Sequence, residues 1–199
     1  MGTLSENIKS SRWIQGKTVL WLFIITNLVY VFMLSVTIPK VMGFAGGMKL
    51  MDMLPTGYDF QYVNTLLVTL GEEGRAVYLY RQIPADMIYP GLFGISYCIL
   101  LLFFLKKLNK LNSPLIYLSV LPLMGGLFDY FENIGIIFML RSFPDLSGNL
   151  VSVTNVFTII KSLTTTVYFI VLLVILVVWI FQFFRKNKNP TQNTSRNIE

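Results

Sequence analysis

The chain has 199 residues, of which 54% are hydrophobic and only 13% are charged, and its formal net charge is +6. Soluble domains carry about 25% charged residues, so this composition excludes an ordinary soluble α/β enzyme. The sequence contains no histidine and one cysteine, which excludes Ser-His-Asp and Cys-His catalysis, histidine-ligated zinc or haem, disulfide frameworks and iron–sulfur clusters. We therefore expect no cofactor and no metal, and any chemistry would depend on carboxylates, lysine, arginine, tyrosine and backbone groups.

Four segments are long and apolar enough to cross a membrane. A spanning helix needs about 20 mostly apolar residues to cross about 30 Å of hydrocarbon. The segments that meet this requirement are residues 18–38, 87–105, 115–140 and 153–184. The first two contain no charged residue, the third contains Asp129 and Glu132, and the fourth contains Lys161. The sequence therefore predicts an all-α membrane protein in which four transmembrane helices form a bundle.

The distribution of lysine and arginine predicts how this bundle is oriented. Ten of the sixteen basic residues lie in the N-terminal arm, in the turn at 106–110 and in the C-terminal tail, whereas five lie on the opposite side. Cytoplasmic segments are enriched in lysine and arginine, so we expect both termini to be cytoplasmic. We expect one domain at residues 1–185, followed by a disordered tail at 186–199. Nucleic-acid binding is not expected, because the basic residues flank apolar spans and form no basic face.

The connection between the first two spans, residues 39–86, is long enough to contain structure of its own. Asp59 can cap a helix. Apolar residues then recur at helical spacing, at Phe60, Val63, Leu66, Leu67 and Leu70. Gly71 is a natural end for this helix. We expect an amphipathic helix on the outer mouth of the bundle.

A second short helix is predicted in the same connection, over about residues 72–82. It would expose Arg75 and Arg81, and Pro84 would end it. Asp86 would then begin the second transmembrane span.

The third span carries polar residues that are costly in lipid. Asp129, Glu132 and Asn133 follow an i, i+3, i+4 spacing, which places them on one helical face. Charged groups at membrane depth normally face the bundle interior and indicate a functional site. Gly125 and Gly126, one turn earlier, favour the close approach of a neighbouring helix.

Lys161 is the expected partner of these carboxylates. Glu132 and Lys161 lie about equally far from the short loop that joins the third and fourth spans, so antiparallel helices place them at similar depth. The fourth span carries a polar stripe at Asn155, Thr158, Lys161, Ser162 and Thr165. Two carboxylates against one lysine leave a surplus of negative charge, for which Arg75 and Arg81 are candidate partners. Asn27 in the first span is a further candidate member.

Four short motifs carry a resemblance to a known family. They are Leu70-Gly71-Glu72-Glu73-Gly74-Arg75 with Tyr78, Asp86 with Tyr89-Pro90, Asp129-x-x-Glu132-Asn133, and Phe157-Thr158-x-x-Lys161. Over roughly residues 50–165 the chain resembles a family of small bacterial four-helix integral membrane proteins, to which no activity is attached. The resemblance implies a multi-pass protein of a bacterial cytoplasmic membrane and supplies no function.

The principal functional hypothesis is a binding or transport-accessory protein. An outward-facing polar cluster would bind a small zwitterionic ligand, a lipid headgroup or an ion. Its candidate residues are Asp129, Glu132, Asn133, Lys161, Thr158, Arg75, Arg81 and Asp86.

Three other functional hypotheses remain open. The protein could be a lipid-modifying enzyme that uses Asp129 or Glu132 as a general base. It could be a scaffold or immunity-type protein whose insert at 39–86 recognises a membrane-protein partner. The polar cluster could also serve to fix which helices pair. Under each of these hypotheses, membrane lipids are expected partners.

Overall fold

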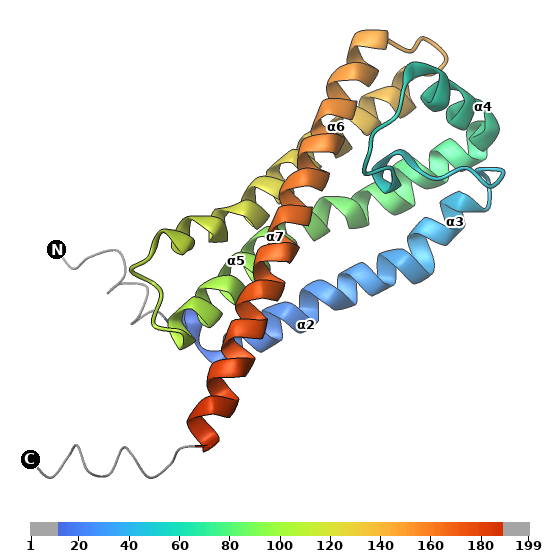
Figure 1. The fold of residues 1–199 in the computed structure, drawn as a ribbon. Coiled ribbons are helices and arrows are strands. Elements are labelled where there is room, and N and C mark those ends of the chain that lie inside the picture. The colour runs from blue at the N-terminus through green and yellow to red at the C-terminus, as the bar shows by residue number, and fades with distance from the viewer. Residues whose placement is uncertain (1–11, 189–199) are drawn as a thin grey trace, which may run out of the picture.

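The computed structural model describes residues 12–188, and residues 1–11 and 189–199 lie outside this description. Within residues 12–188, 85% of the chain is helical and no strand is present, which confirms the all-α prediction. In chain order the elements are η1 (Arg12–Ile14), α2 (Gly16–Phe32), η2 (Met33–Thr37), α3 (Ile38–Met42), η3 (Met51–Met53), α4 (Phe60–Val77), η4 (Tyr78–Gln82), α5 (Ile83–Lys107), η5 (Pro114–Val120), α6 (Leu121–Ser142) and α7 (Gly148–Lys188). Figure 1 shows how they are arranged.

Four continuous helical stretches are long and apolar enough to cross a membrane, as in multi-pass membrane proteins. They are Gly16–Met42, Phe60–Lys107, Pro114–Ser142 and Gly148–Arg185. Large apolar side chains cover the outside of these helices; Leu28 and Leu173, for example, are each 63% exposed. Such a continuous apolar surface is typical of a protein surrounded by lipid.

Several predicted boundaries differ in the structure, where the helix of the second span is α5 (Ile83–Lys107) and the fourth helix begins at Gly148. The first span continues past residue 38 to Met42. The third begins with the 3-10 helix η5 before α6. The predicted disordered tail overlaps α7 at residues 186–188, and the remainder of that tail lies outside the described residues.

A π-helical segment precedes a proline in each of the first two spans. η2 ends two residues before Pro39, and η4 ends two residues before Pro84. The prediction that Pro84 ends a helix was therefore wrong, because the helix runs through it into α5. The wider π turn relieves the clash between the proline ring and the preceding turn. The Thr37 hydroxyl donates to the side-chain oxygen of Gln82, which joins the two π segments.

The connection between the first two spans folds onto one end of the bundle, which we call the α4 end. Asp59 caps α4 by accepting a hydrogen bond of 2.7 Å from the Tyr62 amide, and Gly71 interrupts the helix with a φ of 63°. Both features agree with the predictions from the sequence. The apolar face of α4 is buried against α3, η3 and the ends of the spans through Val63, Leu66, Leu67 and Leu70.

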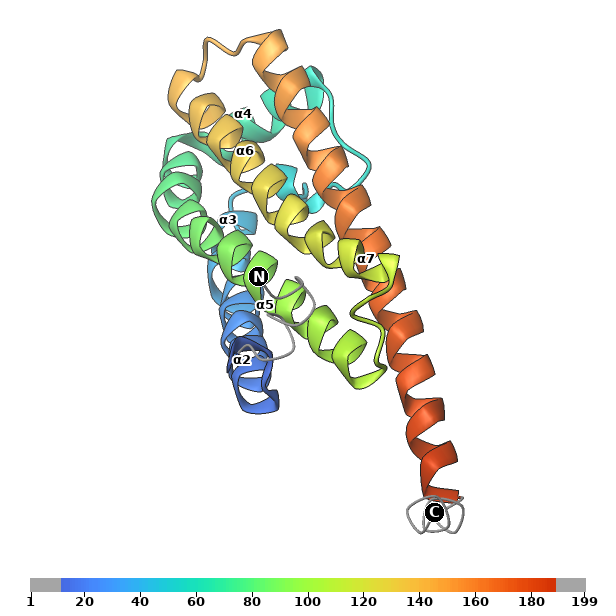
Figure 2. The ribbon, with the colours of Figure 1, turned by 90° about the vertical axis from the view of Figure 1, so that its left-hand side faces the viewer.

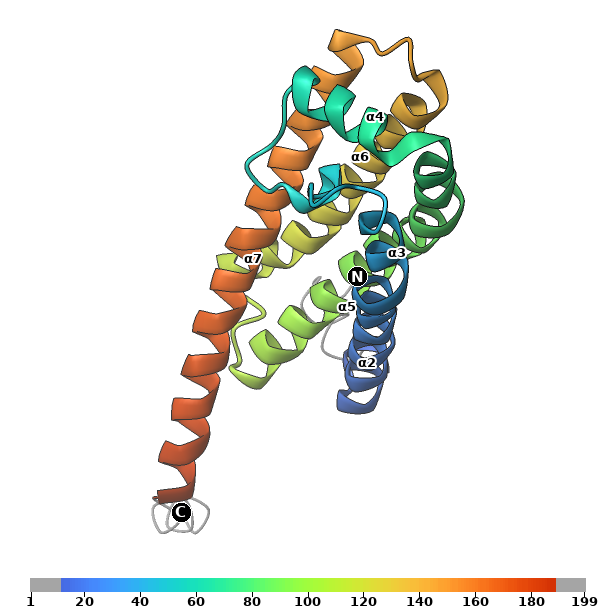
Figure 3. The ribbon, with the colours of Figure 1, turned by 90° about the vertical axis from the view of Figure 1, so that its right-hand side faces the viewer.

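Glycines allow α6 to approach its neighbours closely. A Cβ at Gly126 would lie 2.5 Å from the Pro90 carbonyl of α5, and a Cβ at Gly135 would lie 2.1 Å from the Thr154 hydroxyl of α7. The close approach predicted at Gly126 is therefore present. α5 lies between α2 and α7 in both side views (Figures 2 and 3).

Candidate functional site

The Lys161 ammonium on α7 forms ion pairs with two carboxylates on α6. It lies 3.3 Å from Asp129 Oδ1 and also pairs with Glu132 Oε2. The predicted Asp129/Glu132–Lys161 network is thus present. The side chains of Lys161 and Asp129 are 16% and 12% exposed, whereas that of Glu132 is 0% exposed. Lys161 and Asp129 therefore border an open space, whereas the Glu132 side chain is completely enclosed, or sealed.

The sealed side of this network is held by hydroxyl groups. The Thr158 hydroxyl donates to Glu132 Oε1 at 2.8 Å and lies 3.3 Å from the Tyr58 hydroxyl. The Tyr58 amide donates to Asn155 Oδ1 at 2.8 Å, so the segment before α4 is tied to α7. Burial raises the pKa of Tyr58, which keeps its hydroxyl neutral and able to donate.

Asp52 is a member of the cluster that the sequence analysis missed. It accepts a hydrogen bond of 3.0 Å from the buried Tyr78 hydroxyl, and its carboxyl group interacts electrostatically with Asp86 and Lys161. Asp52 keeps some exposed surface, but protein atoms crowd its carboxyl group. This burial raises its pKa, against the opposing effects of the Lys161 charge and the Tyr78 hydrogen bond.

One sequence signal could have indicated this contact, because Asp52 is a lone carboxylate within an apolar stretch. The contact joins η3 to η4 over 26 positions of the chain. Local sequence pattern does not predict contacts between residues that far apart.

Asn133 and Asp86 are also brought to the cluster. The Asn133 side-chain amide donates to the Asp86 backbone carbonyl at 3.0 Å, which ties α6 to α5. Both residues are buried. Asn133 Oδ1 has no hydrogen-bond partner among the described residues. The structure therefore gathers Asp129, Glu132, Asn133, Thr158, Lys161 and Asp86, as the sequence analysis proposed.

The two arginines do not join the cluster, so the prediction that they balance its charge was wrong. Arg75 donates to the Leu67 carbonyl at 2.7 Å, and its guanidinium lies 4.4 Å from the centre of the Phe143 ring. The helix interruption at Gly71 brings Arg75 back to the end of the preceding helical segment, where a carbonyl needs a donor. Arg81 is exposed on the surface. Asp52, Asp86, Asp129 and Glu132 thus face one ammonium group.

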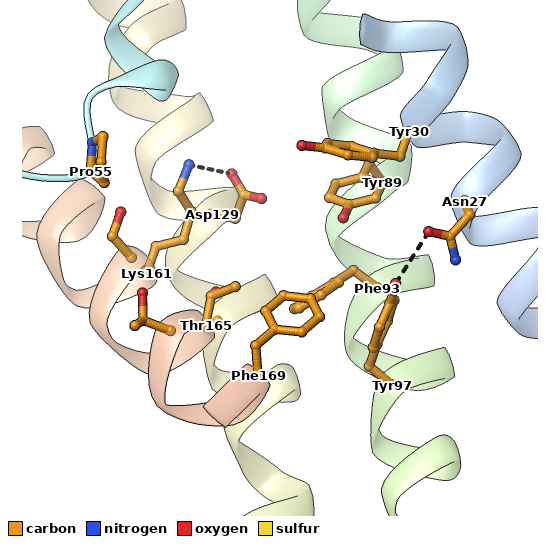
Figure 4. Close-up of a pocket in the computed structure, with 13 residues that line it drawn as sticks. Asn27, Tyr30, Pro55, Tyr89, Phe93, Tyr97, Asp129, Lys161, Thr165 and Phe169 are labelled. Atoms are coloured by element: carbon orange, nitrogen blue, oxygen red, sulfur yellow. Dashed lines mark hydrogen bonds and ion pairs between the residues drawn. The ribbon is translucent and has the colours of Figure 1, made fainter. Parts of the chain in front are cut away.

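Asp129 and Lys161 line a cavity of about 500 Å³. Figure 4 shows these two side chains on one wall and the aromatic rings of Tyr30, Tyr89 and Tyr97 on the opposite wall. The Tyr30 and Tyr89 rings are stacked with centroids 5.3 Å apart. The full lining is Asn27, Tyr30, Pro55, Tyr89, Phe93, Tyr97, Gly125, Asp129, Lys161, Ser162, Thr165, Thr166 and Phe169. We call this space the polar cavity.

Asn27 lies in the polar cavity but across it from the ion pairs. Its side-chain oxygen accepts a hydrogen bond of 3.3 Å from the Tyr97 hydroxyl, and its amide donates to the Phe23 carbonyl at 2.7 Å. The residue therefore shapes the aromatic wall, and it makes no hydrogen bond to the carboxylates or to Lys161.

The polar cavity is equipped for binding charged groups of both signs. A carboxylate, an ammonium, hydroxyl groups and ring faces all border the same space. Within residues 12–188, no group of three or more histidine, cysteine, aspartate or glutamate side chains is arranged to hold a metal ion. No protein-family model matches the chain, and neither the curated proteins nor the solved structures contain a match. The function of the site must therefore be inferred from its geometry.

Proposed function

We propose that this protein is a binding or transport-accessory protein of a bacterial cytoplasmic membrane, and that its polar cavity binds a zwitterionic group. The observation that carries the proposal is the ion pair between Asp129 and Lys161. It borders an open cavity of about 500 Å³, whereas the paired Glu132 is sealed. A pair that served only to join helices has no need of an adjoining cavity.

The two walls of the polar cavity suit the two charges of a zwitterion. A ligand ammonium fits between the Asp129 carboxylate and the stacked rings of Tyr30 and Tyr89, where cation–π attraction adds about 0.5–2 kcal/mol. A ligand anion fits beside the Lys161 ammonium and the Thr165 hydroxyl. The surplus of carboxylates in the cluster favours ligands that bring a cation.

The distribution of basic residues supports an orientation with both termini in the cytoplasm. In that orientation the α4 end faces outward, and the polar cavity opens in the outer half of the membrane.

Binding of a headgroup without its tails tests this proposal. We expect purified protein in detergent micelles to bind glycerophosphoethanolamine, measured by isothermal titration calorimetry. Asp129→Asn should weaken binding about tenfold or more, because it removes the charge that faces the ligand ammonium. Glu73→Gln, at an exposed carboxylate on α4, is the matched control and should bind like the wild type. Absence of wild-type binding, or equal binding by Asp129→Asn, would contradict the proposal.

A further inference from the structure

A second cavity lies next to the polar cavity along the bundle. It has a volume of about 570 Å³ and is lined almost wholly by apolar side chains. Its walls come from α2, α5 and α7, through residues that include Val19, Leu20, Leu100, Phe104, Leu172 and Leu176. We call it the apolar groove. Tyr97 and Phe169 line both spaces, and their rings are in edge-to-face contact with centroids 5.6 Å apart, so the two cavities adjoin across this aromatic pair.

One face of α5 forms the floor of both spaces. Tyr89 and Phe93 line the polar cavity, Tyr97 lines both, and Leu100 and Phe104 line the apolar groove. These positions follow one another at intervals of three or four residues, which places them along a single helical face. The polar cavity and the apolar groove therefore share one helical floor.

α7 and α2 supply the walls with the same order of polarity. Along α7 the lining passes from Lys161 to Phe169 and then to Leu176, a distance of about 22 Å at 1.5 Å per residue. Along α2 it passes from Asn27 to Leu20 in the same direction across the bundle. Three helices thus build one trough that is charged at one end and apolar at the other.

We propose that this trough holds a zwitterionic phospholipid, with its headgroup in the polar cavity and one acyl chain in the apolar groove. This inference rests on the proposed function and names its ligand class. The charges at the polar end complement a headgroup that has a cation and a phosphate. An acyl chain is the apolar extension that reaches the groove from that position.

The two ends of the trough contribute differently to such binding. Lipid tails in the bilayer are as apolar as the leucines of the groove, so moving a tail into the groove gains little hydrophobic free energy. The headgroup therefore supplies the affinity. The groove determines where the tail lies, because Leu100 and Leu172 both line it.

Photocrosslinking tests where the tail lies. We would reconstitute the protein in vesicles of phosphatidylethanolamine and phosphatidylglycerol that contain phosphatidylethanolamine with a diazirine in its acyl chain. After illumination, labelled positions would be mapped by mass spectrometry. We expect label to concentrate on the apolar groove, at Leu100 and Leu172, over the lipid-facing Leu28 and Leu173. Even labelling of all four positions would overturn the inference.

A matched pair of variants on α2 tests whether the labelled acyl chain lies in the apolar groove. Leu20 is 57% exposed and lines the groove, whereas Leu28 is 63% exposed and lines neither space. Leu20→Trp should fill the groove and lower labelling at Leu100 about fivefold or more, and Leu28→Trp should leave it unchanged. Equal labelling in both variants would overturn the inference.

Two further comparisons separate this inference from the proposed function. If glycerophosphoethanolamine binds the wild-type protein but the tail label is even, the lipid assignment fails and the headgroup proposal stands. If neither binding nor concentrated label is found, both fail. If a diazirine-labelled phosphatidylglycerol gives the same concentrated label, the groove accepts tails without regard to the headgroup, and the zwitterionic assignment is overturned.

Discussion

Asp129 and Glu132 lie one helical turn apart on α6 and share the same lysine, but their surroundings differ. Asp129 and Lys161 border the polar cavity, where aromatic rings face them across open space. Glu132 is sealed under the α4 end, where it accepts a hydrogen bond from Thr158, whose hydroxyl also contacts that of Tyr58. We refer to these as the open half and the sealed half of the cluster. The side chain of Glu132 in the sealed half is 0% exposed, so we expect this half to stabilise the fold.

The contact between α6 and α7 does not need the open half. Gly135 allows the two helices to meet at Thr154, well toward the loop that joins them. Interhelical hydrogen bonds in membranes average only about 0.6 kcal/mol, and burying charges is costly. Small residues thus already bring α6 and α7 into contact, without the free-energy cost of burying an ion pair. This favours a ligand-binding role for Asp129.

The largest effect is expected from Lys161→Met, which removes the shared cation from both halves. Breaking a buried ion pair by removing one partner costs about 3–5 kcal/mol, so the free energy of unfolding should fall by about this amount. Reversible unfolding by SDS titration in mixed micelles measures it. The double variant Glu132→Gln/Lys161→Met should recover part of the loss, since no charge then remains in the sealed half. If the double variant also regained full binding of glycerophosphoethanolamine, the cluster would only join helices.

Gly135→Ala tests whether small residues set the α6–α7 contact. The added Cβ would lie 2.1 Å from Thr154 Oγ1, and such overpacking costs about 1–3 kcal/mol. Gly148→Ala is the control, because a Cβ there meets no atom within 4 Å. The same SDS titration should show a loss for Gly135→Ala alone, and equal stability of the two variants would contradict this account of the contact.

Local pattern and helix length were enough to predict much of this fold. The four spans follow from apolar runs of sufficient length, and the cap at Asp59 follows from chemistry within three residues of it. The pairing of Glu132 with Lys161 could be predicted because a short loop between antiparallel helices fixes the relative depth of their residues.

Other features depend on contacts that local pattern does not contain. Pro84 does not end its helix, because the π turn before it accommodates the proline ring. A hydrogen bond between Thr37 and Gln82 joins this π turn to the one in the first span. Arg75 does not reach the carboxylates, because a kink at Gly71 gives it a nearer carbonyl. Asp52 enters the cluster from the short 3-10 helix η3, whose position is determined by the packing of the whole α4 end.

A pair of threonines on α7 sharpens the comparison between the two halves. Thr158 is 0% exposed and donates to Glu132 in the sealed half, whereas Thr165 lines the polar cavity. Thr158→Val should lower the free energy of unfolding by about 1–2 kcal/mol, because Glu132 loses a buried donor. Thr165→Val should change stability by no more than about 0.5 kcal/mol but weaken glycerophosphoethanolamine binding severalfold. The opposite pattern in SDS titration and calorimetry would exchange the roles assigned to the two halves.

The smallest effect concerns Asp52, which extends the sealed half to the α4 end. Burial raises its pKa from the ordinary value of 3.8, so the folded protein favours the protonated carboxyl group. Its stabilising contribution is therefore complete below the ordinary value and is lost as the pH rises through the pKa of the folded state. Asp52→Asn removes this loss while its side-chain oxygen still accepts the Tyr78 hydrogen bond. We expect the variant to gain up to about 1 kcal/mol relative to the wild type at neutral pH, and less at acidic pH.

The free energy of unfolding, measured from about pH 4 to about pH 8, should consequently depend less on pH in Asp52→Asn than in the wild type. Asp59→Asn is the matched control, since asparagine also caps helices and Asp59 lies exposed at the start of α4. It should keep the pH dependence of the wild type. If both variants lost the pH dependence equally, Asp52 would not be the group that causes it. The sealed half would then end at Tyr58, and Asp52 would have no part in it.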